Sequence, residues 1–166
     1  KNIELKISGG ETELDKTVVE KINDPLTHLI RNSLDHGIET PEQRLQAGKS
    51  EKGHIKLTAR HQSGHVIIQI IDDGAGLNKE RIVAKAIANG IVEENHNLTD
   101  QEIYNLIFAA GLSTKEEASD LSGRGVGMDV VRRNIEALRG SVNIDSRPGE
   151  GATITIQLPL TLAIID

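Results

Sequence analysis

Residues 55–76 read IKLTARHQSGHVIIQIIDDGAG and predict two adjacent strands joined by a tight turn. Ile55, Leu57 and Ala59 alternate with polar residues, and a second alternation begins at Val66. Ser63-Gly64 supplies turn chemistry between the two runs. We therefore expect a hairpin that carries Asp72 and a glycine-rich loop at the end of an apolar strand.

The rest of the chain alternates between further strands and amphipathic helices. Strand patterns occur at residues 3–7, 142–144 and 152–158, and helical patterns occur at 15–22, 24–35, 41–47, 79–88, 99–110 and 130–139. Asp24-Pro25 predicts a helix restart, because Asp favours a cap and Pro the first helical position. Thr40 to Gly48 is typical of a short helix in a surface insertion. The hairpins require antiparallel pairing, so we predict an α+β fold, a two-layer α/β sandwich whose mixed, mostly antiparallel sheet is covered on one face by helices.

Composition narrows the possible functions. The 166 residues suit one domain, and the absence of Cys excludes thiolate chemistry and cysteine-bound zinc. A net charge of −6, with Tyr104 and Phe108 as the aromatic residues, disfavours nucleic-acid partners. No run resembles a membrane span or a leader peptide, so we expect a cytoplasmic protein without membrane insertion.

A polar helix face suggests a ligand site. His28, Asn32 and His36 are spaced by four residues, and Asp35 flanks them. The Asn32 amide oxygen is a suitable ligand for a hard cation. The alternative is that these are satisfied polar groups at a helix that packs against a loop. His54, His61 and His65 lie on the first hairpin without metal-binding spacing and are interpreted as surface residues.

Two glycine-rich loops add to this site. Asp72 can accept a hydrogen bond from the exocyclic amine of a base, while Gly74 and Gly76 allow close backbone approach. A plain turn after a strand is the alternative. The loop from Gly123 to Gly127 precedes a helix and can bind phosphate with its amides, although it could instead be a hinge. Residues 112–122 have the composition of a lid, from which Lys115 can reach phosphate more readily than Lys85 can.

These motifs, in this order, resemble the ATP-binding catalytic domain shared by histidine kinases, gyrase-type topoisomerases, Hsp90 chaperones and MutL proteins, known as the Bergerat-type ATP-binding fold. Residues 24–32, 35–39, 41–49 and 122–131 resemble, more narrowly, the CheA family of chemotaxis histidine kinases. The resemblance implies an ATP-binding kinase domain over residues 1–159 with a lid at about 109–125, whose base is Phe108. Residues 160–166 would begin a following regulatory domain or linker.

The resemblance also implies roles for individual residues. Asn32 would ligate Mg²⁺, Asp72 would read adenine with Thr153 nearby, and Lys115 would lie close to the γ-phosphate. The catalytic residues would be His28, Asn32 and Lys115. The implied ATP-binding residues are Asn32, Asp35, His36, Asp72, Gly74, Gly76, Lys85, Ser122, Gly123, Arg124, Gly125, Val126, Gly127, Met128 and Thr153.

His28 indicates the type of reaction. ATP-hydrolysing relatives carry a Glu four residues before the Asn, where it acts as a base towards water, and this chain has an imidazole there. We therefore expect γ-phosphoryl transfer to a histidine on a separate phosphotransfer domain of the same kinase, acting in trans in two-component signalling. Dimerisation and receptor-coupling domains of the parent chain, and indirectly a chemoreceptor and its coupling protein, are the other expected partners. The competing hypotheses are a nucleotide-gated clamp that hydrolyses ATP and a non-catalytic nucleotide-sensing module.

Overall fold

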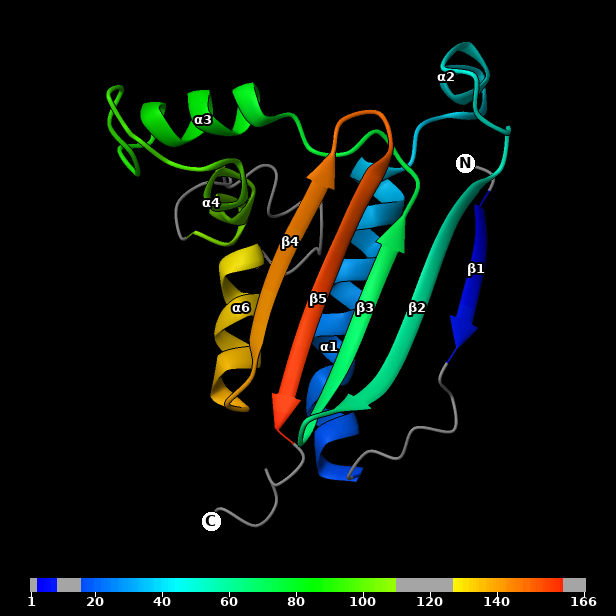
Figure 1. Cartoon of the computed structure of the whole chain (residues 1–166), viewed down its shortest axis with the longest axis vertical. Coiled ribbons are helices and arrows are strands. Elements are labelled where there is room, and N and C mark those ends of the chain that lie inside the picture. The colour runs from blue at the N-terminus through cyan, green and yellow to red at the C-terminus, as the bar shows by residue number, and fades with distance from the viewer. Residues whose placement is uncertain (1–2, 9–15, 110–126, 160–166) are drawn as a thin grey trace.

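The computed structural model describes residues 3–8, 16–109 and 127–159 of the chain (Figure 1). Within them lies a sheet with the strand order β1-β2-β3-β5-β4. The strands are β1 (Ile3–Ser8), β2 (Gly53–Gln62), β3 (His65–Asp72), β4 (Ser141–Arg147) and β5 (Gly151–Pro159). β1 pairs with β2 in parallel, and the remaining pairs are antiparallel. The predicted mixed, mostly antiparallel sheet and both of its hairpins are confirmed.

Helices cover one face of this sheet and also lie beyond its end. They are α1 (Lys16–Asn32), the π-helical turn η1 (Ser33–Gly37), α2 (Pro41–Gln46), α3 (Lys79–Ala88), α4 (Asp100–Asn105), the 3-10 turn η2 (Leu106–Phe108) and α6 (Met128–Ala137). Figure 1 shows α1 behind the sheet and leaves the opposite face of the strands open to view. α6 packs against α1, β4 and η2. The α+β two-layer prediction therefore holds.

The core forms between the helices and alternate residues of the central strands. In β3 and β5 the paired residues Ile68 and Ile156 are buried, and Ile70 and Ile154 extend the same row. Leu29 of α1 is also fully buried in this core. Each such side chain contributes about 1.5–3 kcal/mol when removed from water, so this layer anchors α1 to the sheet.

A side chain forms hydrogen bonds with part of the free edge of strand β4. Asn105, at the end of α4, donates from its amide nitrogen to the Ile144 carbonyl at 3.2 Å. Its amide oxygen accepts from the Ile144 N–H at 3.1 Å. These two bonds imitate a neighbouring strand and satisfy edge groups that would otherwise be open to pairing with another chain.

Two helix predictions need correction. α1 runs unbroken through Pro25, so the predicted restart at Asp24-Pro25 is wrong. A proline in a helix interior removes one backbone hydrogen bond, and the buried side chains of Ile22 and Leu29 on either side hold the helix together despite this loss. The predicted helix at 99–110 starts with the expected capping box of Thr99 and Glu102, but it tightens into η2 after Asn105.

The insertion around α2 is only partly at the surface. Thr40 and Gln43 form the predicted capping box. Most of residues 40–48 are exposed, as expected of a surface insertion, but Arg44 is only 1% exposed. Figure 1 shows α2 beyond the end of β3 that carries Asp72. No helix in the described ranges is both long and apolar enough to cross a membrane.

Candidate functional site

Asp72 is a buried carboxyl group at the end of β3. It is 6% exposed and lies on the helix-covered face, in register with Ala152. Its Oδ1 accepts N–H bonds from Gly74 at 2.9 Å and Ala152 at 3.3 Å. Burial raises the pKa of Asp72, while these backbone bonds and the Ser33 hydroxyl oppose that rise. The carboxyl is therefore held in one orientation by η1, its own loop and β5.

Glycines bring three backbone segments close around this carboxyl. A Cβ on Gly74 would overlap the Gly37 carbonyl oxygen, and a Cβ on Gly151 would overlap the Asp72 carbonyl oxygen. The Ala75 N–H donates to that same Gly37 oxygen at 2.9 Å. A Cβ on Gly37 would come within 3.4 Å of Asp72 Oδ2. η1, the loop after β3 and the start of β5 thus form one interlocked unit.

The end of α1 carries two of the predicted side chains. The Asn32 amide nitrogen lies 2.6 Å from Met128 Sδ at the start of α6, which turns the amide oxygen away from the sulfur. The Nε2 of His28 is buried and has no hydrogen-bond partner among the described residues. Burial, followed by the charge of Arg31, lowers the pKa of His28 and favours its neutral imidazole.

The Asn32 amide oxygen suits a cation that takes its other ligands from phosphate and water. Among the described residues, no group of three or more His, Cys, Asp or Glu could hold a metal by itself. Mg²⁺ commonly takes one or two protein oxygens and completes its shell with water and phosphate. The Asn32 amide oxygen fits such a partial site.

A family model described as "Histidine kinase-, DNA gyrase B-, and HSP90-like ATPase" matches residues 21–162. The chain belongs to this ATPase family. Its similarity to relatives runs over its whole length. It is 59% identical to the "Chemotaxis protein CheA" of Salmonella typhimurium, over 100% of this chain and 25% of the relative. It is 54% identical to the protein of the same name from Rhizobium meliloti, over 100% of this chain and 22% of the relative.

Solved structures support the fold alone. The histidine kinase domain of the Erythrobacter litoralis EL346 blue-light activated histidine kinase is 14% identical, with a TM-score of 0.57 over 99% of this chain and 59% of that one. The Acinetobacter baumannii histidine kinase AdeS is 18% identical, with a TM-score of 0.52 over 96% of this chain and 54% of that one. The fold of these solved structures is thus consistent with the family that the sequence comparison shows.

One predicted adenine contact of this ATPase-family site is misplaced. Thr153 pairs with Ile71, whereas Asp72 pairs with Ala152. Because side chains alternate across a sheet, Thr153 projects from the face opposite to Asp72. The prediction that Thr153 lies beside Asp72 is wrong by one residue, and Ala152 contributes its N–H at that position instead.

The glycines of the loop allow the close backbone approach that the sequence predicts, and here the approach is to other parts of the same chain. The space next to Gly74 is filled by the Gly37 carbonyl, and the space next to Gly76 is filled by the Arg147 carbonyl. Gly76 has a φ of +77°, which favours glycine. These two residues therefore let the loop pack closely against its own chain.

The remaining predicted residues are divided among several places. Asp35 and His36 are exposed on η1, where the wider π turn shifts His36 out of the α-helical spacing with His28 and Asn32. Lys85 lies on α3, which packs on α4 and η2. Gly127 and Met128 open α6. Lys115, Ser122, Gly123, Arg124, Gly125, Val126 and the proposed lid lie outside the described residues.

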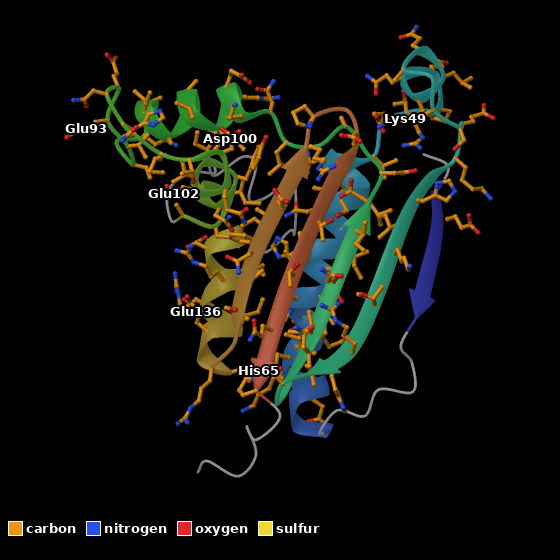
Figure 2. All side chains as sticks on the ribbon, viewed as in Figure 1. Lys49, His65, Glu93, Asp100, Glu102 and Glu136 are labelled. Atoms are coloured by element: carbon orange, nitrogen blue, oxygen red, sulfur yellow. The ribbon has the colours of Figure 1, made fainter. Side chains whose placement is uncertain are left out.

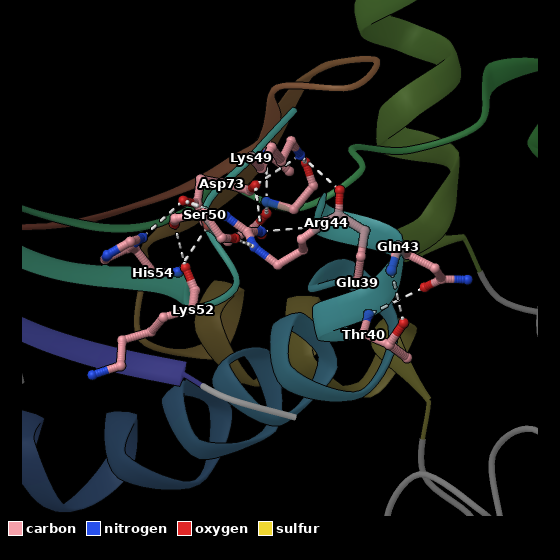
Figure 3. A network of polar contacts seen from close by, with 12 residues as sticks. Glu39, Thr40, Gln43, Arg44, Lys49, Ser50, Lys52, His54 and Asp73 are labelled. Carbon is pink, nitrogen blue, oxygen red and sulfur yellow. Dashed lines mark hydrogen bonds and ion pairs between the residues drawn. The ribbon is translucent and has the colours of Figure 1, made fainter. Parts of the chain in front are cut away.

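Sequence reasoning missed a charged network beside Asp72 (Figure 3). Asp73 accepts from the backbone N–H of His54 at 2.8 Å and from Arg44 Nη2 at 3.0 Å. Glu39 and Lys49 complete the network. Two adjacent carboxylates after a buried strand were the available signal, since such a pair needs a nearby cation. His65, by contrast, lies at the other end of the sheet from Lys49 (Figure 2).

Proposed function

We propose that this chain is the Mg-ATP-binding catalytic domain of a chemotaxis histidine kinase, which transfers the γ-phosphoryl group to a histidine on a separate phosphotransfer domain. The observation that carries the proposal is Asp72, a carboxyl at the end of a strand that is buried and held by two backbone donors. The names of the relatives support it, including the "Sensor histidine kinase CheAY" of Helicobacter pylori, which is 52% identical over 99% of this chain and 21% of that protein.

The proposed base contact follows from the two Asp72 oxygens. Oδ1 already accepts two backbone N–H groups, and Oδ2 faces Gly37, where a larger residue would approach the carboxyl. An exocyclic adenine amine is a donor that suits the remaining acceptor capacity. A carbonyl at the same position of the base would be repelled, so this contact selects adenine.

The phosphates are proposed to lie between the end of α1 and the start of α6. Asn32 contacts Met128 directly, so these two helix ends meet. Amides at the N-terminus of α6, from Gly127 onwards, suit phosphate oxygens. Asn32 would hold Mg²⁺, which neutralises phosphate charge when bound. Lys115 and residues 122–126 are proposed to complete the site, with residues 109–125 as its lid.

His28 favours transfer over hydrolysis. In the proposed step, a ring nitrogen of the acceptor histidine attacks the γ-phosphorus, a P–N bond forms, and the bond to the bridging oxygen breaks with its electrons leaving on ADP. The neutral, partly buried imidazole of His28 is a weak substitute for the carboxylate that would activate water. It is suited to orienting the phosphate or the incoming ring.

The proposal also concerns the parent protein as a whole. The chain spans about a quarter of the length of the curated relatives that it matches, at 22% and 25% of the first two. We propose that other parts of a cytoplasmic parent supply the phosphotransfer, dimerisation and receptor-coupling domains. A chemoreceptor and its coupling protein would then act on this domain indirectly.

The test follows γ-labelled phosphate from Mg-ATP when the chain is mixed with an excess of a purified CheA-type phosphotransfer domain. The expected result is acid-labile label on that domain, lost with Asn32→Ala. Label found only as free phosphate would favour the hydrolysing clamp. Nucleotide binding without either product would favour a non-catalytic sensor.

A further inference from the structure

Arg44 is a buried cation whose guanidinium makes four hydrogen bonds. Its Nε donates to the Ser50 carbonyl at 2.7 Å, and its Nη1 donates to Glu39 Oε1 at 2.9 Å. Nη1 also donates to the Asp73 carbonyl at 3.1 Å, and Nη2 donates to Asp73 Oδ2 at 3.0 Å. One side chain therefore holds both the backbone and the carboxylate of Asp73 (Figure 3).

Lys49 holds the next peptide of the same loop. Its ammonium group donates to the carbonyls of Asp73 at 2.9 Å and Gly74 at 2.7 Å. Glu39 bridges the two cations, because its Oε2 lies 2.7 Å from Lys49 Nζ and its Oε1 binds Arg44. We call Glu39, Arg44 and Lys49 the insertion clamp, since all three belong to the segment around α2.

The clamp acts on the residue that directly follows Asp72. Asp72 bonds to its own loop and to β5, whereas Asp73 bonds to β2 and the clamp. The side chains of these two consecutive residues therefore point to different partners. Burial disfavours the charge on Asp73, but His54 and Arg44 more than compensate and hold the pKa of Asp73 below its ordinary value. Because one peptide joins the two residues, a displacement of the Asp73 backbone would shift the peptide from which the Asp72 side chain projects.

We propose that Arg44 is a positioning residue for adenine recognition: by fixing Asp73 it keeps the adjacent Asp72 carboxylate directed at the exocyclic amine of the base. This inference rests on the proposed function. Arg44 does not touch the nucleotide in this arrangement and acts through the peptide that joins Asp72 to Asp73. Its loss should affect recognition of the base more than binding of the phosphates.

The test compares two nucleotides that differ at the recognised group. ATP carries the exocyclic amine, and inosine triphosphate has a carbonyl there. Equilibrium affinities for both, in the presence of Mg²⁺, are measured for the wild type, Arg44→Lys, Arg44→Met and Asp72→Asn. Arg60→Met is the matched control, because Arg60 is exposed on β2 and bonds to Gln62 within its own strand.

We expect both Arg44 variants to lower the ratio of ATP affinity to inosine triphosphate affinity by about tenfold, which is the loss of roughly one good hydrogen bond. Asp72→Asn should lower the ratio at least as much, and Arg60→Met should leave it unchanged. A ratio retained in the Arg44 variants, with both affinities falling equally, would assign Arg44 a purely structural role and overturn the inference.

A second variant covers failure of folding, since removal of Arg44 takes away the buried cation that Glu39 and Asp73 share. Lys49 is 18% exposed and holds the same loop, so Lys49→Met should fold and lower the same ratio. An unchanged ratio there would also count against the inference. A wild type that binds neither nucleotide would instead refute the proposed function itself.

Discussion

At the scale of single residues, the charged Asp72 carboxylate that is proposed to recognise the base should also lower the stability of the nucleotide-free protein. Its folded-state pKa is raised above the ordinary 3.8, chiefly by burial. Protonated Asp72 therefore makes its full contribution to the free energy of unfolding when the pH is below the ordinary pKa. That contribution is lost as the pH rises through the pKa of the folded state. Asp72→Asn should therefore raise the melting temperature of the nucleotide-free protein by a few degrees at neutral pH while weakening ATP binding.

Thermal melts between about pH 4 and pH 8 test this prediction, because the difference from wild type should shrink towards the acidic end. Glu150→Gln, at an exposed turn position, is the control and should match the wild type throughout. A variant that melts below the wild type at every pH would show that the charge of Asp72 stabilises the fold.

His28 should make stability depend on pH in the opposite direction. Burial and Arg31 lower its pKa below the ordinary 6.5. The unfolded chain then binds the proton on His28 more readily than the folded chain does. The contribution of His28 to stability is therefore fully present above its ordinary pKa and is lost as the pH falls towards the pKa of the folded state. His28→Gln should flatten the loss between about pH 7.5 and pH 5.5. The measurement is urea unfolding over this range, with the exposed His61→Gln retaining the wild-type slope.

At the scale of elements, the contact of η1 with the loop after β3 depends on the absence of a side chain at Gly74. A Cβ there would overlap the Gly37 carbonyl oxygen, so Gly74→Ala should destabilise the fold by about 3 kcal/mol through forced displacement of the backbone. It should also weaken nucleotide binding. Both effects are read from denaturant unfolding and titration with ATP.

Gly64→Ala is the matched control for that change. Gly64 has a φ of +77°, and a Cβ added there would meet nothing within 4 Å. The substitution should cost only about 1 kcal/mol, from the left-handed backbone conformation, and leave ATP affinity unchanged. Equal losses in the two variants would mean that backbone conformation, and not the close contact with Gly37, dominates at Gly74.

The elements also show how far sequence reasoning reaches. Alternation and turn chemistry predicted both hairpins, because strand periodicity and tight turns are local properties. The continuity of α1 through Pro25 depends on burial of side chains elsewhere on the helix, which a local rule does not include. The burial of Arg44 depends on Asp73, a partner distant in sequence, so an exposed helix was the natural expectation.

The candidate site was predictable in part for the same reason. Asp72 can be identified from the sequence because it follows an apolar strand directly. Thr153 was misplaced because the face of a residue near a hairpin turn depends on register, and a slip of one residue reverses it. The domain boundary near residue 159, the lid and Lys115 stay predictions.

At the scale of the whole molecule, Mg-ATP should stabilise the fold by mass action. A ligand at one hundred times its dissociation constant adds about 2.7 kcal/mol, which raises the melting temperature by roughly 5–10 °C for a domain of this size. Chelation of Mg²⁺ or Asn32→Ala should remove most of that shift. Thermal melts with and without EDTA measure it, and a shift that EDTA removes but Asn32→Ala retains would exclude Asn32 as the metal ligand.

The parallel pairing of β1 with β2 has a consequence for the order of folding. β2 with β3, and β4 with β5, are neighbours along the chain, whereas α1, η1 and α2 all lie between β1 and β2. Closing that long intervening segment carries a larger entropic barrier than closing a short turn. The two hairpins should therefore form first, and the amides of β1 should become protected from exchange during refolding only after those that pair within each hairpin.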